Sequence, residues 1–396
     1  MKRTLLALGF VCSFLAGAQT VSNAPDSKYQ FTKVYHLDAT PVQDQGMTGT
    51  CWSFSSLSFF ESELIRMGVK NPSNLSVMYI VRKAYEAKAD RFIRMDGKTN
   101  FGEGGAFHDI PWVIKRYGIV PKDVYTGLNG KTEYDHEELF SVLNSFMQTI
   151  LAQVQKGEGI GSEWKVAFNG VLDAYLGKDI TEFTYNGKKY TPKTYAESLG
   201  LKMNDYVSIT SFTNDPFYET CEIAIPDNWT WGDSYNVPME DMVTVVENAL
   251  KNGYTLAWGA DVSERGFNFR QGIAVVPEDP STIQVRGRDN KSFNNAGAER
   301  VSNAFLEPVT ELKVTQEMRQ EGYDEKLTTD DHGMHIVGMY KDQNGTRYFL
   351  VKNSWGTENM PQGYLYVSEH YFRLKTINVY LHKDGLPKEL RAKLKI

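Results

Sequence analysis

Apolar side chains recur every three to four residues near the N-terminal end of the chain. Phe54, Leu57 and Leu64 share this spacing, and Gly68 follows the last turn of the segment. The period is that of an amphipathic helix, and a glycine just past the last apolar position is typical of a helix C-terminus. The pattern therefore predicts a helix that begins at Cys51.

A different pattern near the C-terminal end predicts two β-strands. An apolar stretch runs from His335 to Tyr340, the dipeptide Asn344-Gly345 is typical of a tight hairpin turn, and residues 347–353 alternate between apolar and polar. The two strands are then antiparallel neighbours. We expect their register to bring Asn353 beside His335.

The region between these two patterns is predicted to be a mainly helical insertion. Apolar residues recur at helical spacing in 136–155 and 161–176, and a third helix over 239–252 is bracketed by a proline and a glycine. Residues 183–190 predict a small hairpin between them. A buried strand from residue 255 then returns the chain to the core.

The first 18 residues have the pattern of a targeting segment. Lys2 and Arg3 precede an apolar run of residues 5–15, and a small-residue cleavage site ends at Ala18. The run is too short to span a membrane, and no other stretch approaches 18 apolar residues. We expect a signal peptide and export to a bacterial periplasm or beyond; an uncleaved anchor is the alternative.

Cys51 is the candidate nucleophile. At a helix N-terminus the unpaired N–H groups and the positive end of the dipole favour a thiolate and lower the thiol pKa. Gln45, six residues upstream, offers a side-chain amide that can stabilise an oxyanion together with the N–H of Cys51. A buried, inert cysteine is the plainer alternative.

A thiol nucleophile also needs a base, and His335 is the candidate. If Asn353 lies beside it, the amide oxygen accepts a hydrogen bond from one imidazole nitrogen and leaves the other facing the thiol. Trp355 can then shield the pair from water. His108 lies in a less suitable context and is more simply explained as a packing or surface histidine.

These residues carry a family resemblance. The order of the motifs resembles the papain-like (C1) cysteine peptidases, and the matching segments are Gln45, Cys51-Trp52, His335 and Asn353-Ser354-Trp355-Gly356. The resemblance implies that Gln45, Cys51, His335 and Asn353 are catalytic. It also implies that Gly104 and Gly105 hold the substrate backbone, whereas composition alone would indicate a turn.

The spacing of the motifs narrows the resemblance. Cys51 and His335 are 284 residues apart, about 140 more than a papain needs. Together with the segments 235–239 and 259–262, this resembles the bleomycin hydrolase and aminopeptidase C branch. That branch implies an α+β fold with a papain-like two-lobed core, a helical lobe plus an antiparallel β-barrel-like lobe, and a large mainly helical insertion.

We expect the parts of the chain in the order signal peptide (1–18), helical lobe with the cysteine (19–120), helical insertion (121–254) and β-rich lobe with the histidine and asparagine (255–396). The branch also implies a homo-hexamer. Its members often carry a C-terminal arm in the cleft, and the sequence after residue 381 looks too short to form one.

Charge and composition exclude other classes of function. The net charge is −6, and −8 without Lys2 and Arg3, which does not suit nucleic acid. The close pair His332 and His335 is the only hint of a metal site, so we expect no metal and no cofactor. Pairing Cys51 with Cys221 would consume the nucleophile, so we expect no disulfide.

The function predicted from the sequence is cysteine peptidase, with aminopeptidase activity on peptide substrates. Two alternatives stay open. An open cleft would permit endopeptidase activity, and a decayed site would leave a secreted peptide-binding protein without catalysis.

Overall fold

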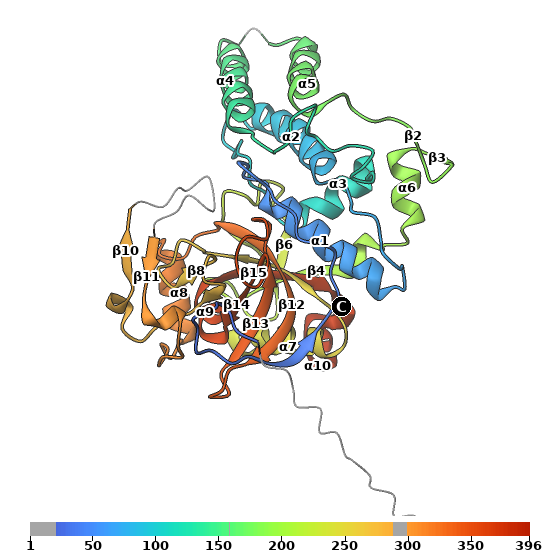
Figure 1. Ribbon diagram of the computed structural model, residues 1–396. Coiled ribbons are helices and arrows are strands. Elements are labelled where there is room, and N and C mark those ends of the chain that lie inside the picture. The colour runs from blue at the N-terminus through green and yellow to red at the C-terminus, as the bar shows by residue number, and fades with distance from the viewer. Residues whose placement is uncertain (1–20, 158, 288–298) are drawn as a thin grey trace, which may run out of the picture.

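The computed structural model describes residues 21–157, 159–287 and 299–396 (Figure 1). The expected signal peptide, residues 1–18, lies outside them. The helices are α1 (Cys51–Arg66), α2 (Val77–Arg94), α3 (Asp109–Tyr117), α4 (Glu137–Val154), α5 (Glu163–Leu176), α6 (Pro192–Ser198), α7 (Met239–Lys251), α8 (Gln316–Asp324), α9 (Glu369–Lys375) and α10 (Lys388–Leu394).

The strands of the main sheet come from distant parts of the chain. They are β1 (Thr32–His36), β4 (Tyr206–Thr210), β5 (Thr220–Glu222), β6 (Asp233–Asn236), β7 (Leu256–Ala260), β8 (Phe267–Asn268), β9 (Ile273–Ala274), β12 (His332–Lys341), β13 (Arg347–Lys352), β14 (Tyr364–Ser368) and β15 (Thr376–His382). Two small hairpins lie outside it, β2 (Phe183–Tyr185) with β3 (Lys188–Tyr190) and β10 (Gln284–Arg286) with β11 (Glu299–Val301).

The described residues form two lobes, one helical and one β-rich, as the fold class predicts. The order of the main sheet is β5-β6-β4-β15-β7-β12-β13-β14-β9-β8, with β1 on β12, and most neighbouring strands are antiparallel. Helices α2 to α6 stand on one side of α1 and the sheet lies on the other (Figure 1). Helix α1 is thus the element at which the lobes meet.

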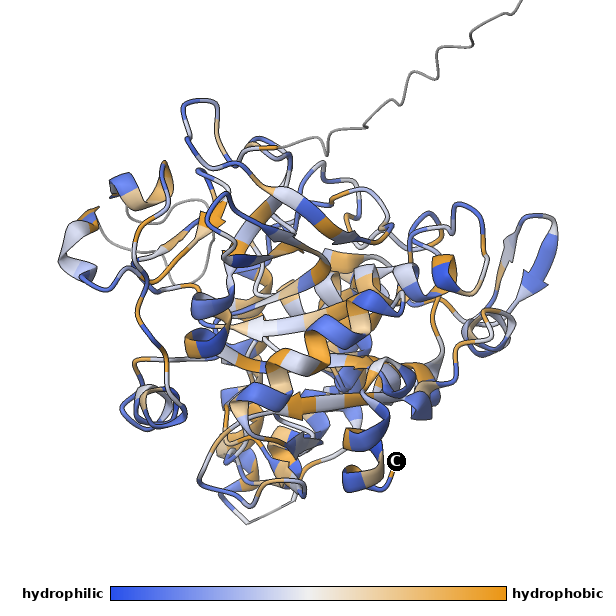
Figure 2. Ribbon diagram, turned by 90° about the horizontal axis from the view of Figure 1, so that it is seen from below, coloured by the Kyte–Doolittle hydropathy of each residue, from blue (hydrophilic) through white to orange (hydrophobic). Residues whose placement is uncertain are grey.

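Each lobe has its own apolar core. The helical core includes Phe59 and Phe60 of α1 and extends through α2, α3, α4 and α5, while the β core is formed by the sheet with α7, α9 and α10. Apolar residues gather on the inner strands and on the helices that cover them, and polar residues dominate the outer loops (Figure 2). Burial of these faces is the main source of stability.

The β-rich lobe begins earlier in the chain than we expected. Strand β4 pairs with β15 over five residue pairs, and α7 contributes Met242 and Val246 to the core beneath the sheet. The helical part of the insertion therefore ends near residue 205, and residues 206–254 belong with the sheet. No helix in the described ranges is both long and apolar enough to cross a membrane.

Candidate active site

Cys51 is the first residue of α1, as the apolar period predicts. The segment with the paired glycines is fixed beside it, because the Trp52 indole N–H donates to the carbonyl of Glu103 (3.0 Å) and the Glu103 carboxylate accepts from the N–H of Gly49 (2.7 Å). A Cβ on Gly105 would come within 2.9 Å of the Trp52 ring. Glycine at this position lets the backbone lie directly against Trp52, the residue after Cys51.

Asn353 lies beside His332 and not beside His335, so the predicted pairing is wrong. The Asn353 Oδ1 atom is 2.7 Å from Nε2 of His332 and also accepts from the N–H of Ser354. An amide oxygen only accepts, so Nε2 carries the proton and Nδ1 holds a lone pair. The Trp355 ring lies 4.5 Å from the His332 ring, so the shielding predicted for Trp355 falls on this histidine.

A β-bulge explains the error. Near the turn, Lys341 pairs with Arg347, and an unbroken ladder from there would place His335 opposite Asn353. The register shifts by one residue between Ile336 and Gly338, so that His335 faces Lys352 instead. Because side chains alternate along a strand, a one-residue shift moves Asn353 to the other face of the hairpin.

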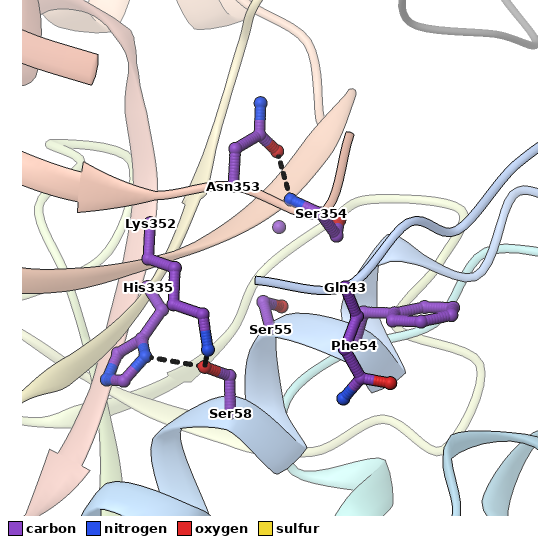
Figure 3. Close-up of a pocket in the computed structure, with 9 residues that line it drawn as sticks. Gln43, Phe54, Ser55, Ser58, His335, Lys352, Asn353 and Ser354 are labelled. Atoms are coloured by element: carbon purple, nitrogen blue, oxygen red, sulfur yellow. Dashed lines mark hydrogen bonds between the residues drawn. The ribbon is translucent and has the colours of Figure 1, made fainter. Parts of the chain in front are cut away.

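His335 lies in a buried polar network behind the site. Its Nδ1 is 2.9 Å from Ser58 Oγ, which also accepts from Lys352 Nζ (2.7 Å). A cavity of about 10 Å³, room for about one water molecule, adjoins this network. Figure 3 shows His335 and Lys352 directed at Ser58, while the Asn353 side chain points away from them. His335 therefore packs the sheet against α1.

The residue after His332, Gly333, lies against the start of α1, where Cys51 is located. The N–H of Gly333 contacts the Cys51 sulfur, and a Cβ on Gly333 would press on Ser55 and on the Cα of Trp52. The start of β12 and the start of α1 are thus in direct contact. The sequence signal that could have identified His332 is this glycine, since only a residue without a side chain allows such an approach.

Gln45 is buried next to these residues. Its Oε1 accepts from Ser354 Oγ (2.6 Å), and its Nε2 donates to the carbonyl of Thr48 (2.8 Å). A side-chain amide nitrogen carries two hydrogens, so one remains after the bond to Thr48. The N–H of Cys51 belongs to the first helical turn, where N–H groups have no partner within the helix.

The thiol pKa is raised and not lowered, contrary to the expectation from the helix terminus. Burial raises the pKa of Cys51 to about 12; the N–H groups of Gly333 and Trp52 lower it, and the charges of Asp330 and Asp227 raise it further. The Trp52 N–H at the start of the helix thus lowers the thiol pKa as predicted, but loss of hydration raises this pKa by more.

Burial also lowers the pKa of His332 to about 4, against the opposing effects of Asn353 and Asp331. At neutral pH the free site therefore holds a neutral thiol and a neutral imidazole with an available lone pair. Such an imidazole can accept the thiol proton during attack on a carbonyl, which is general-base chemistry. Both described cysteines are free.

Comparisons with known proteins agree with this arrangement. Residues 294–396 match the model of the Peptidase C1-like family. Aminopeptidase C of Lactococcus lactis subsp. lactis is 22% identical over 418 residues, covering 96% of this chain and 88% of the relative. Aminopeptidase C of Listeria monocytogenes is 24% identical over 417 residues, covering 94% and 88%.

A solved structure shows the same fold. The crystal structure of PepW from Lactobacillus rhamnosis aligns with a TM-score of 0.69 and 20% identity, covering 92% of this chain and 84% of that one. The chain is thus similar over almost its whole length to proteins named aminopeptidase C, its C-terminal part matches the Peptidase C1-like family, and it shares the fold of PepW.

Proposed function

We propose that the protein removes N-terminal residues from peptides through a thioester formed on Cys51, with His332 as the general base and acid. The observation that carries this assignment is the bond from His332 Nε2 to Asn353 Oδ1, which leaves a lone pair on Nδ1 one residue away from Gly333, whose N–H acts on the Cys51 thiol. Relatives named aminopeptidase C support the exopeptidase activity.

The steps follow from the positions of the groups. His332 takes the proton of Cys51 as the sulfur attacks the carbonyl carbon, and the oxyanion receives hydrogen bonds from the Cys51 N–H and the Gln45 amide. His332 then gives the proton to the leaving amine as the C–N bond breaks. Water, deprotonated by His332, adds to the thioester and releases the residue and the thiol. Gly104 and Gly105 present backbone to the substrate.

Comparison of the two histidines tests the proposal. We expect His332→Gln to lower kcat/KM for an alanyl anilide by about 1000-fold, since a general base contributes 100- to 10,000-fold. We expect His335→Gln to stay within about tenfold of wild type, because glutamine can still bond to Ser58. Steady-state hydrolysis is the measurement, with Cys51→Ala as the background.

Circular dichroism and thermal melting establish that both variants fold. A folded His332→Gln enzyme with wild-type kcat/KM, or a folded His335→Gln enzyme with the activity of Cys51→Ala, would show that the assignment of the base is wrong. Hydrolysis of peptides with blocked N-termini at the same rate as free ones would instead indicate an endopeptidase.

We also propose that the protein is exported and that the signal peptide is cleaved after Ala18. The support is the charged, apolar and small-residue pattern of residues 1–18. N-terminal sequencing of the mature protein tests it; a chain that starts at Gln19 supports cleavage, and one that retains Lys2 and Arg3 contradicts it.

A further inference from the structure

The segment from Gly102 to Ala106 is rich in glycine and passes beside the nucleophile. Three of its five residues are glycine, and the Trp52 ring lies against Gly105. Glycine backbone has the widest choice of conformations, so such a segment is flexible unless other groups hold it. A flexible segment would lose entropy each time it bound a substrate. Groups that fix its conformation in advance therefore favour binding.

Lys88 of α2 holds this segment from the helical lobe. Its ammonium group donates to the carbonyl of Gly102 (2.9 Å) and to the carbonyl of Gly104. The two carbonyls flank Glu103, so one side chain fixes the backbone on both sides of that residue. The ammonium nitrogen also lies 5.7 Å from the centre of the Trp229 ring, which is a favourable cation–π distance.

Lys88 is buried without a carboxylate partner. The residue is 1% exposed, and no carboxylate in the ranges 21–157, 159–287 and 299–396 lies within ion-pair distance of its ammonium group. Burial lowers the pKa of this group, and the charges of Asp227, Asp109 and Glu103 raise it. Burying an ammonium group costs free energy unless it is paired or hydrogen-bonded. Here the compensating bonds come from the backbone of the glycine segment.

Lys83, on the same helix, has a different set of partners. It too is buried, but its ammonium group forms ion pairs with Glu86 (3.2 Å) and Asp179 (2.6 Å). Neither acid belongs to the glycine segment. Of these two buried lysines, only Lys88 is bonded to the active-site backbone, and its position is not explained by an ion pair.

The other carbonyls of the segment are occupied as well, with one exception. The Glu103 carbonyl accepts from the Trp52 indole N–H (3.0 Å). The Ala106 carbonyl accepts from the N–H of Asp109 (3.0 Å). The carbonyl of Gly105 has no hydrogen-bond partner in the part of the chain that the structure describes, and neither has its N–H. Gly105 thus offers one acceptor and one donor to a bound peptide.

We propose that Lys88 is a positioning residue for substrate binding, because its two bonds hold the glycine segment in the conformation that leaves the backbone of Gly105 free. This inference rests on the proposed function, in which the segment presents backbone to the peptide. An extended substrate can pair with a free N–H and C=O as a strand pairs with a sheet edge. Without Lys88 the carbonyls of Gly102 and Gly104 lose their partner. Buried carbonyls without a partner cost free energy, so the flexible backbone is expected to rearrange.

The test replaces Lys88 with methionine, which has a similar length but no donor. We expect Lys88→Met to raise KM for alanyl p-nitroanilide about 10- to 100-fold, as loss of hydrogen bonds to a charged group predicts, and to change kcat less than about threefold. Lys83→Met is the matched control. It removes a buried lysine from the same helix without touching the glycine segment, and it should keep the KM of wild type.

A second variant covers the case in which Lys88→Met does not fold. The amide nitrogen of glutamine is one bond closer to the backbone than the lysine ammonium, so Lys88→Gln keeps a donor but cannot hold both carbonyls in the same way. Its KM should rise in the same direction, by less than for methionine. Circular dichroism and thermal melting establish which variants fold.

Alkylation of Cys51 by iodoacetamide separates a shift of the segment from damage to the whole site. The reagent is small and does not need the backbone of Gly105 for its reaction with the thiol. The alkylation rate of Lys88→Met should therefore stay within about threefold of wild type between about pH 6 and 9, while KM for the anilide rises.

The outcomes separate this inference from the function on which it rests. A folded Lys88 variant with the KM of wild type, or one whose alkylation slows as much as its hydrolysis, would overturn the positioning role and leave the peptidase intact. Equal losses in Lys88→Met and Lys83→Met would do the same. A wild-type enzyme that does not cleave the anilide would overturn the proposed function itself, before any variant is made. A rise in KM confined to the Lys88 variants, with unchanged alkylation, supports the proposal.

Discussion

At the scale of single residues, the neighbours of Cys51 determine how readily its thiol loses a proton. Burial is the largest reason for its raised pKa, and the charges of Asp330 and Asp227 add to it. Removing these charges would therefore ease loss of the thiol proton to His332.

We therefore predict that the double variant Asp227→Asn/Asp330→Asn has a more reactive thiol. Removing negative charge lowers the pKa of Cys51, so the thiolate fraction at any pH below that pKa rises, by about tenfold for one pKa unit. The rate of alkylation by iodoacetamide should rise accordingly at pH 7 to 8.

The double variant is needed because the two acids interact, so loss of one makes ionisation of the other easier. Lys88 and Asp109, which also act on Asp227, stay in place, and so does Asp331, whose single variant Asp331→Asn is the control. A pH profile of alkylation that stays unchanged, or moves to higher pH, would show that the charges of these two carboxylates do not raise the pKa of Cys51.

At the scale of elements, the sequence predicted which segments form helices and strands better than it predicted how the strands pair. Helix α1 begins at Cys51, as the spacing of its apolar residues predicts. The hairpin at residues 183–190 turns at Asn186 and Gly187, both with positive φ, as that dipeptide predicts. Such local signals lie within a few residues of each other.

What the sequence did not reveal depends on contacts between distant segments. The bulge in β12 lies where Gly338 lets the backbone of β1 approach, and a Cβ there would come within 2.7 Å of the carbonyl oxygen of Tyr35. Likewise β4 joins the sheet through β15, about 170 residues later. Neither partner can be identified from the local pattern, so the partner of Asn353 was predicted wrongly and the β-rich lobe begins earlier than expected.

The contact between the end of α3 and the start of α6 leads to a prediction about stability. Gly118 ends α3 with φ of 85°, and a Cβ there would collide with the backbone of Pro192 at the start of α6. Gly118→Ala should lower the free energy of unfolding by about 2–4 kcal/mol, from the positive-φ conformation (φ 85°, ψ −160°), which favours glycine, and the collision together. Urea denaturation measures it.

Gly253 offers the matched control for this junction. It follows α7 with φ of 84°, but a Cβ there meets no atom within 4 Å. Gly253→Ala should therefore cost only about 1 kcal/mol, the conformational part alone. If the two variants lose the same free energy, the contact between α3 and α6 contributes nothing to stability.

At the scale of the whole molecule, both lobes bury neutral histidines, and this couples folding to pH. His332 and His335 lie where the lobes meet, and His136 lies in the helical lobe; burial lowers the pKa of each. Unfolding returns these groups to water, where the pKa is about 6.5. The unfolded chain therefore binds protons that the folded protein does not bind, and the folded state loses stability as the pH falls.

A variant of His136 allows the effect of pH on stability to be measured without changing the proposed catalytic residues. Burial, helped by Lys131 and opposed by Asp135, lowers its pKa to about 4, and neither ring nitrogen has a hydrogen-bond partner among the described residues. Between pH 6.5 and pH 4 the unfolded state binds the extra proton, so this residue should cost wild type about 3 kcal/mol of stability over that interval. His136→Phe loses no hydrogen bond and cannot bind the proton. Denaturation curves at pH 7, 5.5 and 4 should therefore show the variant gaining on wild type as the pH falls, whereas a constant difference would mean that His136 is hydrated or already protonated in the folded protein.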